Sequence, residues 1–143
     1  KYYLHFIPLL YLFIICFFIM YEKINISVGE LWDKYSILLI KKQNIQSLEK
    51  RKHVECEINF LKQNMDKYSY IDHPLFFELK DINHALWEIE DKIRVKEKMK
   101  CFDEEFILLA RSVYITNDKR HEVKNKINIH YGSDIFEVKD YVK

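Results

Sequence analysis

The residues with the greatest capacity for chemistry stand in the stretch "LWEIEDKIRVKE", residues 86–97. Trp87, Glu90 and Arg94 follow one another at spacings of 3 and 4, which places them on one face of a helix, and Asp91 adjoins them. An arginine guanidinium is a planar fork that matches a carboxylate or a phosphate. A neighbouring carboxylate can orient that fork or act as an acid or base. The pattern therefore indicates a candidate site for an anionic small ligand.

A second polar line lies in the last helical segment, where Arg111, Tyr114 and Asp118 share a face beside Arg120. Lys34 adds a cation from the first helical segment. If the faces meet, their side chains converge at the edge of the core around a phosphorylated or carboxylated ligand. The expected ligand-binding set is Lys34, Trp87, Glu90, Asp91, Arg94, Arg111, Tyr114, Asp118 and Arg120.

The same side chains also fit an ordinary solvated helix face. Glu90 and Arg94 form an i,i+4 pair, which is worth roughly 0.3–0.5 kcal/mol on a helix surface. Trp87 is of a type that more often packs than binds. The first interpretation of the chain is therefore a non-enzymatic helical interaction or accessory module, and the alternative is a small-molecule binding or catalytic bundle. The sequence identifies no catalytic residue and leaves open whether the protein is an enzyme.

Several classes of function find no support in the sequence. It contains no Gly-rich phosphate loop, no HExxH and no GxSxG. Cys16, Cys56 and Cys101 are widely spaced without a CxxC, which is typical of reduced thiols in the cytosol, and we expect neither metal nor cofactor. With 23 Lys+Arg against 22 Asp+Glu, bulk charge gives no reason to expect a nucleic acid partner.

An all-α fold follows from the scarcity of helix breakers, with two Gly and two Pro in 143 residues. Ser27 and Asp103 are candidate N-caps, Pro74 opens a helix that ends near Lys100, and Gly132 suits the end of the last one. Between about residues 28 and 65 the pattern allows one long helix or two helices that meet near residues 46–50. Short connections then predict a small antiparallel bundle of three to four long helices, with a weakly alternating tail that could be extended.

The apolar seam of the third segment has spacings of 3 and 4 through Leu79, Ile82, Leu86, Ile89 and Ile93, as in a bundle core or coiled coil. A matching seam in the last segment contains Leu109 and Val113. We expect a shared core of Leu86, Ile89, Ile93, Leu109 and Val113.

The first residues form a separate apolar segment, residues 1–22, ahead of a helical-bundle domain at residues 23–143. Tyr2 to Tyr21 carries no charge unless His5 is protonated, and it has the length of a membrane-spanning helix. A signal peptide and over-extended translation ahead of Met20 are the alternatives. We expect a cytoplasmic protein if the chain starts at Met20, and a single-pass membrane-anchored one if the segment is genuine.

Four blocks in order, "ISVGELWDKYSILLIKK", "INHALWEIEDKIRVKE", "FDEEFILLARSVYITNDKR" and "KINIHYGSDIFEVKDY", resemble domain-of-unknown-function family 6165. The resemblance covers about Ile24 to Tyr141. It implies relatives in bacteria and large viruses, sometimes near sugar-transfer or surface-polysaccharide functions, and transfers no catalytic residue. The expected partners are a protein or a second copy, an anionic small molecule, and a membrane only if residues 2–19 are translated.

Overall fold

Four helices make up most of residues 22–141, which are the residues that the structure, a computed structural model, describes. They are α2 (Val28–Asn44), α3 (Leu48–Met65), α4 (Pro74–Met99) and α5 (Glu104–His130), and this part of the chain contains no strand. The prediction of an all-α helical bundle is confirmed.

Local chemistry sets the helix boundaries. Ser27 Oγ accepts from the backbone N–H of Glu30 at 3.2 Å, and Asp103 Oδ1 accepts from that of Phe106 at 3.0 Å. Between Asn44 and Leu48 the chain is not helical, so the pattern that allowed one long helix folds as two. Across this break, Arg51 of α3 donates from Nη2 to the carbonyl oxygen of Ile45 at 3.0 Å.

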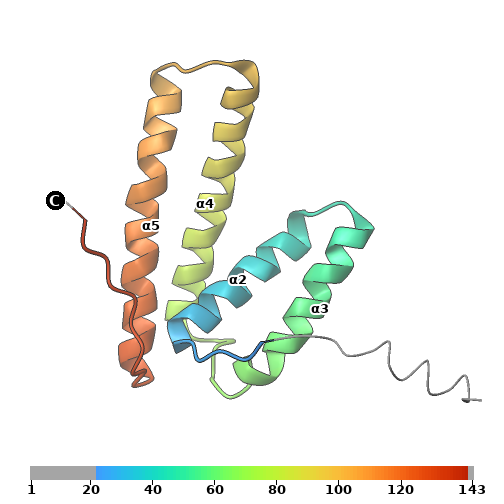
Figure 1. Cartoon of the computed structure of the whole chain (residues 1–143), viewed down its shortest axis with the longest axis vertical. Coiled ribbons are helices and arrows are strands. Elements are labelled where there is room, and N and C mark those ends of the chain that lie inside the picture. The colour runs from blue at the N-terminus through green and yellow to red at the C-terminus, as the bar shows by residue number, and fades with distance from the viewer. Residues whose placement is uncertain (1–21, 142–143) are drawn as a thin grey trace, which may run out of the picture.

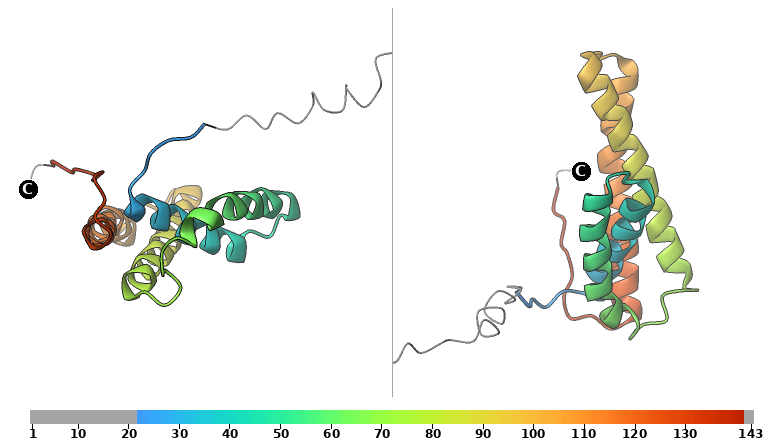
Figure 2. Two further views of the ribbon diagram at one scale, coloured as in Figure 1. Left: turned by 90° about the horizontal axis from the view of Figure 1, so that it is seen from below. Right: turned by 90° about the vertical axis from the view of Figure 1, so that its right-hand side faces the viewer.

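The helices form two hairpins of unequal length (Figure 1). Helices α4 and α5 make the longer one, and α2 and α3 make a shorter arm that crosses its lower half. Helix α2 is central because it packs against α3, α4 and α5. The upper half of the α4–α5 hairpin extends beyond the arm in both side views (Figures 1 and 2).

The hydrophobic core lies at the lower end of the hairpin. Trp32 of α2 is fully buried, with its ring edge-on to those of Phe76 and Tyr131 at centroid distances of 5.7 and 5.3 Å. Leu79 and Ile127 of the long hairpin are also fully buried beside it. Helix α2 therefore supplies the largest buried side chain of the core.

The expected shared core higher on the hairpin is only partly present. Leu86 is buried, but Ile89, Ile93, Leu109 and Val113 are half-buried, which corrects that prediction. The reason is that the α2–α3 arm does not cover the hairpin at that height. The described residues likewise give no support for a coiled coil.

Helix α2 approaches α5 very closely at Gly29. The Gly29 N–H donates to Asn128 Oδ1 at 2.7 Å, and the Val28 N–H donates to Ser133 Oγ at 3.2 Å. A Cβ at residue 29 would lie 2.5 Å from the backbone oxygen of Lys124. Only glycine permits this approach.

A turn at Gly132, with φ of 62°, sends the tail back beside the lower half of α5 (Figure 2). Glu137 accepts a hydrogen bond from Lys124 Nζ at 2.7 Å, and Lys139 Nζ donates to the Asn117 backbone oxygen at 3.1 Å. Burial alone lowers the pKa of Lys124, but hydrogen bonds to Glu137 and Glu30 outweigh it and leave that pKa raised. The hydrogen bond from Lys124 lowers the pKa of Glu137. The segment after Gly132, which the sequence suggested could be extended, is therefore held against α5 by ion pairs, and its described residues form no strand.

The candidate membrane segment falls on residues 1–21, outside the described part of the chain. Among residues 22–141, no helix is both long enough and apolar enough to cross a membrane.

We predict that Gly29→Ala lowers the free energy of unfolding by about 1–3 kcal/mol, because the added methyl meets backbone that cannot move aside. Denaturant melts followed by far-ultraviolet circular dichroism would measure this. Gly132→Asn is the control, since nothing lies within 4 Å of a Cβ there and Asn tolerates a positive φ. A more stable Gly29→Ala, as at an ordinary exposed helix position, would contradict the close approach.

We predict that Glu137→Gln destabilises the protein at neutral pH and not in acid. The pKa of Glu137 is lower in the folded protein than the value of about 4.3 expected in the unfolded chain. Ionised Glu137 therefore stabilises the fold above that pH, and this contribution is lost as the pH falls through the folded pKa. The difference between wild type and variant in denaturant melts should therefore vanish below that pH. Asp134→Asn is a control in the same tail, because Asp134 makes no ion pair within the described residues. A difference that persists unchanged in strong acid would show that the Lys124–Glu137 pair is not its source.

Candidate functional site

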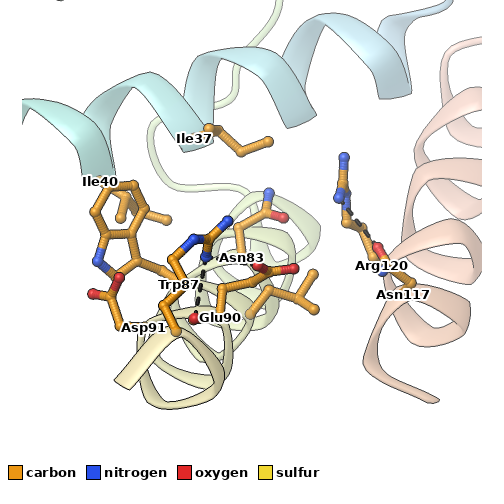
Figure 3. A pocket seen from close by; sticks show the side chains of 10 residues that line it. Ile37, Ile40, Asn83, Trp87, Glu90, Asp91, Asn117 and Arg120 are labelled. Carbon is orange, nitrogen blue, oxygen red and sulfur yellow. Dashed lines mark hydrogen bonds and ion pairs between the residues drawn. The ribbon is translucent and has the colours of Figure 1, made fainter. Parts of the chain in front are cut away.

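A cleft of about 480 Å³ opens where α2 leaves the α4–α5 hairpin (Figure 3). All three helices contribute to its lining. The lining residues are Ile37, Ile40, Asn83, Leu86, Trp87, Glu90, Asp91, Arg94, Asn117 and Arg120. This volume is within the range of small-ligand sites.

The floor of the cleft rests on a buried carboxylate, Asp33 of α2, which is 3% exposed. Arg120 of α5 donates two hydrogen bonds to this carboxylate, from Nε to Oδ1 at 2.9 Å and from Nη2 to Oδ2 at 2.7 Å. Asn83 Nδ2 of α4 adds a third hydrogen bond to Oδ1 at 2.8 Å. A buried carboxylate needs such partners, and here they come from two other helices.

The orientation of the Asn83 carboxamide follows from this network. A carboxylate only accepts, and Ser36 Oγ already donates to the Asp33 backbone oxygen at 2.8 Å. The Asn83 atom that faces both groups must therefore be the NH₂, at 2.8 Å from Ser36 Oγ. Its Oδ1 is left as an acceptor with no hydrogen bond from any described residue, although Asn83 is buried.

Arg120, the other polar residue of the floor, also keeps unused hydrogen-bonding groups. Its Nη1 donates to Asn117 Oδ1 at 3.2 Å, which holds the guanidinium from the α5 side. One N–H on Nη1 and one on Nη2 remain unused, because a guanidinium carries five N–H groups. Figure 3 shows the Arg120 and Asn83 side chains entering the cleft from different helices.

The remaining walls are apolar on one side and charged at the rim. Ile37, Ile40 and Leu86 stand beside the half-buried Trp87, whose indole N–H has no partner among the described residues. At the rim, Arg94 Nη1 donates to Glu90 Oε2 at 2.7 Å, and the Arg94 side chain is 68% exposed. Asp91 makes no ion pair within residues 22–141.

Both guanidinium groups of the cleft form ion pairs with carboxylates of the same chain. Arg120 is paired with Asp33, and Arg94 is paired with Glu90. Asp91 is the third carboxylate, so three formal negative charges stand against two positive ones. The cleft therefore offers a polar, slightly acidic environment next to an aromatic wall.

The structure brings together part of the expected site. Trp87, Glu90, Asp91, Arg94 and Arg120 all line the cleft.

The other expected residues lie elsewhere. Lys34 pairs with Glu57 of α3 at 2.5 Å, and Asp118 pairs with Lys139 at 3.3 Å. Arg111 and Tyr114 are exposed and do not line the cleft. The two polar lines therefore do not oppose each other, because α5 presents Arg120 and Asn117 to the cleft.

Sequence reasoning missed the α2 side of the site, which consists of Asp33, Ser36, Ile37 and Ile40. The signal was present, since spacings of 3, 1 and 3 place these residues on one face of α2. Asn83 lies four residues before Trp87 on the same face of its helix, but it was not among the expected site residues. Among residues 22–141, no group of three or more His, Cys, Asp or Glu side chains is placed to hold a metal ion.

Comparison with family models gives a match over most of the chain. A family model described as a family of unknown function, DUF6165, matches residues 22–143. No curated protein and no solved structure matches the chain.

We predict that Arg120→Ala lowers the free energy of unfolding by about 3–5 kcal/mol, because it leaves the Asp33 carboxylate buried without its charged partner. Arg94→Ala is the matched control and should cost about 0–1 kcal/mol, because its pair with Glu90 is exposed. Urea melts of both variants would measure the contrast. Equal losses would mean that Asp33 gains no particular stability from Arg120.

Proposed function

The chain belongs to the DUF6165 family of unknown function, and we propose that it is a non-enzymatic helical module that binds a neutral, polyhydroxylated ligand in its cleft. The observation that carries the proposal is that Asn83 and Arg120, which both hydrogen-bond Asp33 Oδ1, keep an acceptor and two N–H donors without partners among the described residues. A hydroxyl group can donate to Asn83 Oδ1 and accept from the Arg120 guanidinium. Neighbouring hydroxyls on one ligand would use both.

The aromatic wall suits the same kind of ligand. The Trp87 ring and the side chains of Ile37 and Ile40 can cover the C–H face of a ring, while its hydroxyls reach the floor and Asp91. A sugar ring is the plainest ligand of this kind. An accessory role in sugar-transfer or surface-polysaccharide systems is part of the proposal, since the same chemistry would serve there.

The pairing of the charged groups supports a role in binding and not in catalysis. Glu90 is held by Arg94, and Asp33 is enclosed by Arg120 and Asn83. These pairs position the guanidiniums and stabilise the floor.

An anionic ligand is the second candidate, and the exposure of Arg94 favours it. Because its side chain is 68% exposed, the guanidinium could leave Glu90 and meet a phosphate or carboxylate at the rim. The carboxylates of the cleft and its floor oppose this candidate, since three formal negative charges stand there against two positive ones.

We predict that neutral sugars, and not charged probes, bind the full chain. Saturation-transfer NMR would be recorded with glucose, mannose, galactose and N-acetylglucosamine, and with a sugar phosphate, citrate and spermidine as charged probes. Trp87→Ala should abolish the signal of a neutral sugar that binds, because it removes the stacking wall. Phe77→Ala is the matched control, as it removes a 49% exposed aromatic from α4 outside the cleft.

Two results would overturn the proposal. One is that no neutral sugar gives a signal, and the other is that the signal persists in Trp87→Ala. A signal from the sugar phosphate or citrate alone, lost in Arg94→Gln, would favour the anionic candidate.

A further inference from the structure

We infer that His73 and His130, the histidine pair, form an acid-sensitive contact that closes the lower end of the α4–α5 hairpin and opens when the pair takes up a proton. His73 stands immediately before α4, and His130 is the last residue of α5. Their Nε2 atoms face each other at 3.4 Å, and their ring centroids lie 4.8 Å apart. This inference is independent of the ligand proposed for the cleft.

The N-cap of α4 determines which nitrogen of His73 carries the hydrogen. His73 Nδ1 accepts a hydrogen bond from the backbone N–H of Leu75 at 3.2 Å. A neutral imidazole has one acceptor nitrogen and one N–H group, so the hydrogen of His73 is on Nε2. That N–H faces His130 Nε2, which must be the acceptor. The hydrogen of neutral His130 is therefore on Nδ1.

A proton added to the histidine pair removes one of these two hydrogen bonds. If His130 Nε2 takes the proton, its N–H faces the N–H on His73 Nε2, and two donors stand opposite each other. If His73 takes the proton or changes tautomer, an N–H on Nδ1 faces the N–H of Leu75, and the cap is lost. No protonated form of the pair keeps both contacts.

The helix ends determine which histidine takes the first proton. His130 lies in the last turn of α5, where the helix dipole favours a cation, and His73 lies at the start of α4, where the dipole opposes one. Burial and the neighbouring His130 also lower the pKa of His73. The first proton therefore goes to His130, and it breaks the contact between the two rings.

The surroundings of the histidine pair do not compensate the added charge. The titratable or charged residues next to it in the chain or in space are Tyr68, Asp72, Glu78, Lys126 and Tyr131. Glu78 of α4 and Lys126 of α5 pair with each other at 3.9 Å, and burial raises the pKa of the Tyr131 phenol, which stays neutral. Helix α2 faces His73 with the uncharged indole of Trp32. Among residues 22–141, neither histidine forms an ion pair with a carboxylate.

Separation of the histidine pair uncovers Trp32. The centroid of its ring is 5.2 Å from that of His73 and 5.3 Å from that of Tyr131, and the side chain is fully buried. Hydrogen bonds at Gly29 and Asp33 hold α2 against α5 independently of the pair. We therefore expect acid to expose Trp32 locally, without loss of helix.

Tryptophan fluorescence of the full chain isolates this event. The chain contains two tryptophans, so Trp87→Phe leaves Trp32 as the single reporter. Between pH 8 and pH 5 we expect the Trp32 emission to shift to longer wavelength and its quenching by acrylamide to increase, while far-ultraviolet circular dichroism stays unchanged. The midpoint should lie below about 6.5, the pKa of a free histidine, because the hydrogen bond between the rings favours the neutral pair.

Three variants in this background assign the transition. His73→Asn should make the emission independent of pH, because Asn caps a helix without titrating. His130→Gln should move the transition to lower pH, because the proton must then go to the buried ring of His73. His84→Gln is the matched control and should keep the wild-type transition, since His84 is an exposed histidine of α4 outside the pair.

The tautomers give a test that needs no variant. Nitrogen-15 NMR of the imidazole rings at pH 8 should place the hydrogen on Nε2 of His73 and on Nδ1 of His130. A His73 with its hydrogen on Nδ1, a Trp32 emission that is constant between pH 8 and pH 5, or a transition that persists in His73→Asn would overturn the inference. Loss of helix at the same pH as the emission change would do so as well.

Discussion

The buried carboxylate of Asp33 is the constraint on which the arrangement of the three central helices depends. It accepts two hydrogen bonds from Arg120 of α5 and one from Asn83 of α4, while it stands on α2. Taking a carboxylate out of water costs several kcal/mol, and full pairing offsets that cost without making the pair a large source of stability. Its main effect is on specificity, since a placement of the helices that separated these partners would leave a buried carboxylate unpaired.

Polar interactions fix the position of α2 against α5 along the rest of their contact as well. Arg120, Lys124 and Asn128 stand four residues apart on α5, and they meet Asp33, Glu30 and the N–H of Gly29 on α2. Each of these interactions depends on direction, and there is about one of them per turn of α5. A slip of one turn would leave a buried charge unpaired, and it would place a residue with a Cβ where Gly29 packs, which would push α2 away from α5. An apolar interface alone would resist such a slip less, because Leu and Ile side chains accept many neighbours.

The features that could be predicted from the sequence are those that depend on residues close together in the chain. The caps at Ser27 and Asp103 and the turn at Gly132 were predictable, because each depends on residues within one turn. Half of the cleft was predictable as well, since Trp87, Glu90 and Arg94 share a face of one helix.

The rest depended on how helices face each other, which periodicity does not determine. Helix α5 carries two apolar lines, one through Val113 and Ile127 and one through Leu108 and Ile115, and both fit a buried seam. The line through Leu109 and Val113 was expected to face α4, but periodicity does not show which neighbouring line borders the cleft, so Arg111 and Tyr114 were expected there. Asp33 was missed for a related reason, because an isolated acid is usually exposed and only its partners on α4 and α5 explain its burial.

The cleft and the exposed upper part of the α4–α5 hairpin have the same structural origin. Asp33 and Gly29 fix the first half of α2 against the lower hairpin, so its second half diverges toward α3 (Figure 1). Ile37 and Ile40 on the diverging half then face Trp87 across an open space and not across a packed seam. Above that point nothing in the described chain covers the hairpin, and its apolar side chains, from Ile89 to Ile115, are half-buried or exposed. Because full burial of these side chains would favour folding, leaving them open has a cost in stability. A ligand in the cleft would recover part of that burial beside Trp87, Ile37 and Ile40.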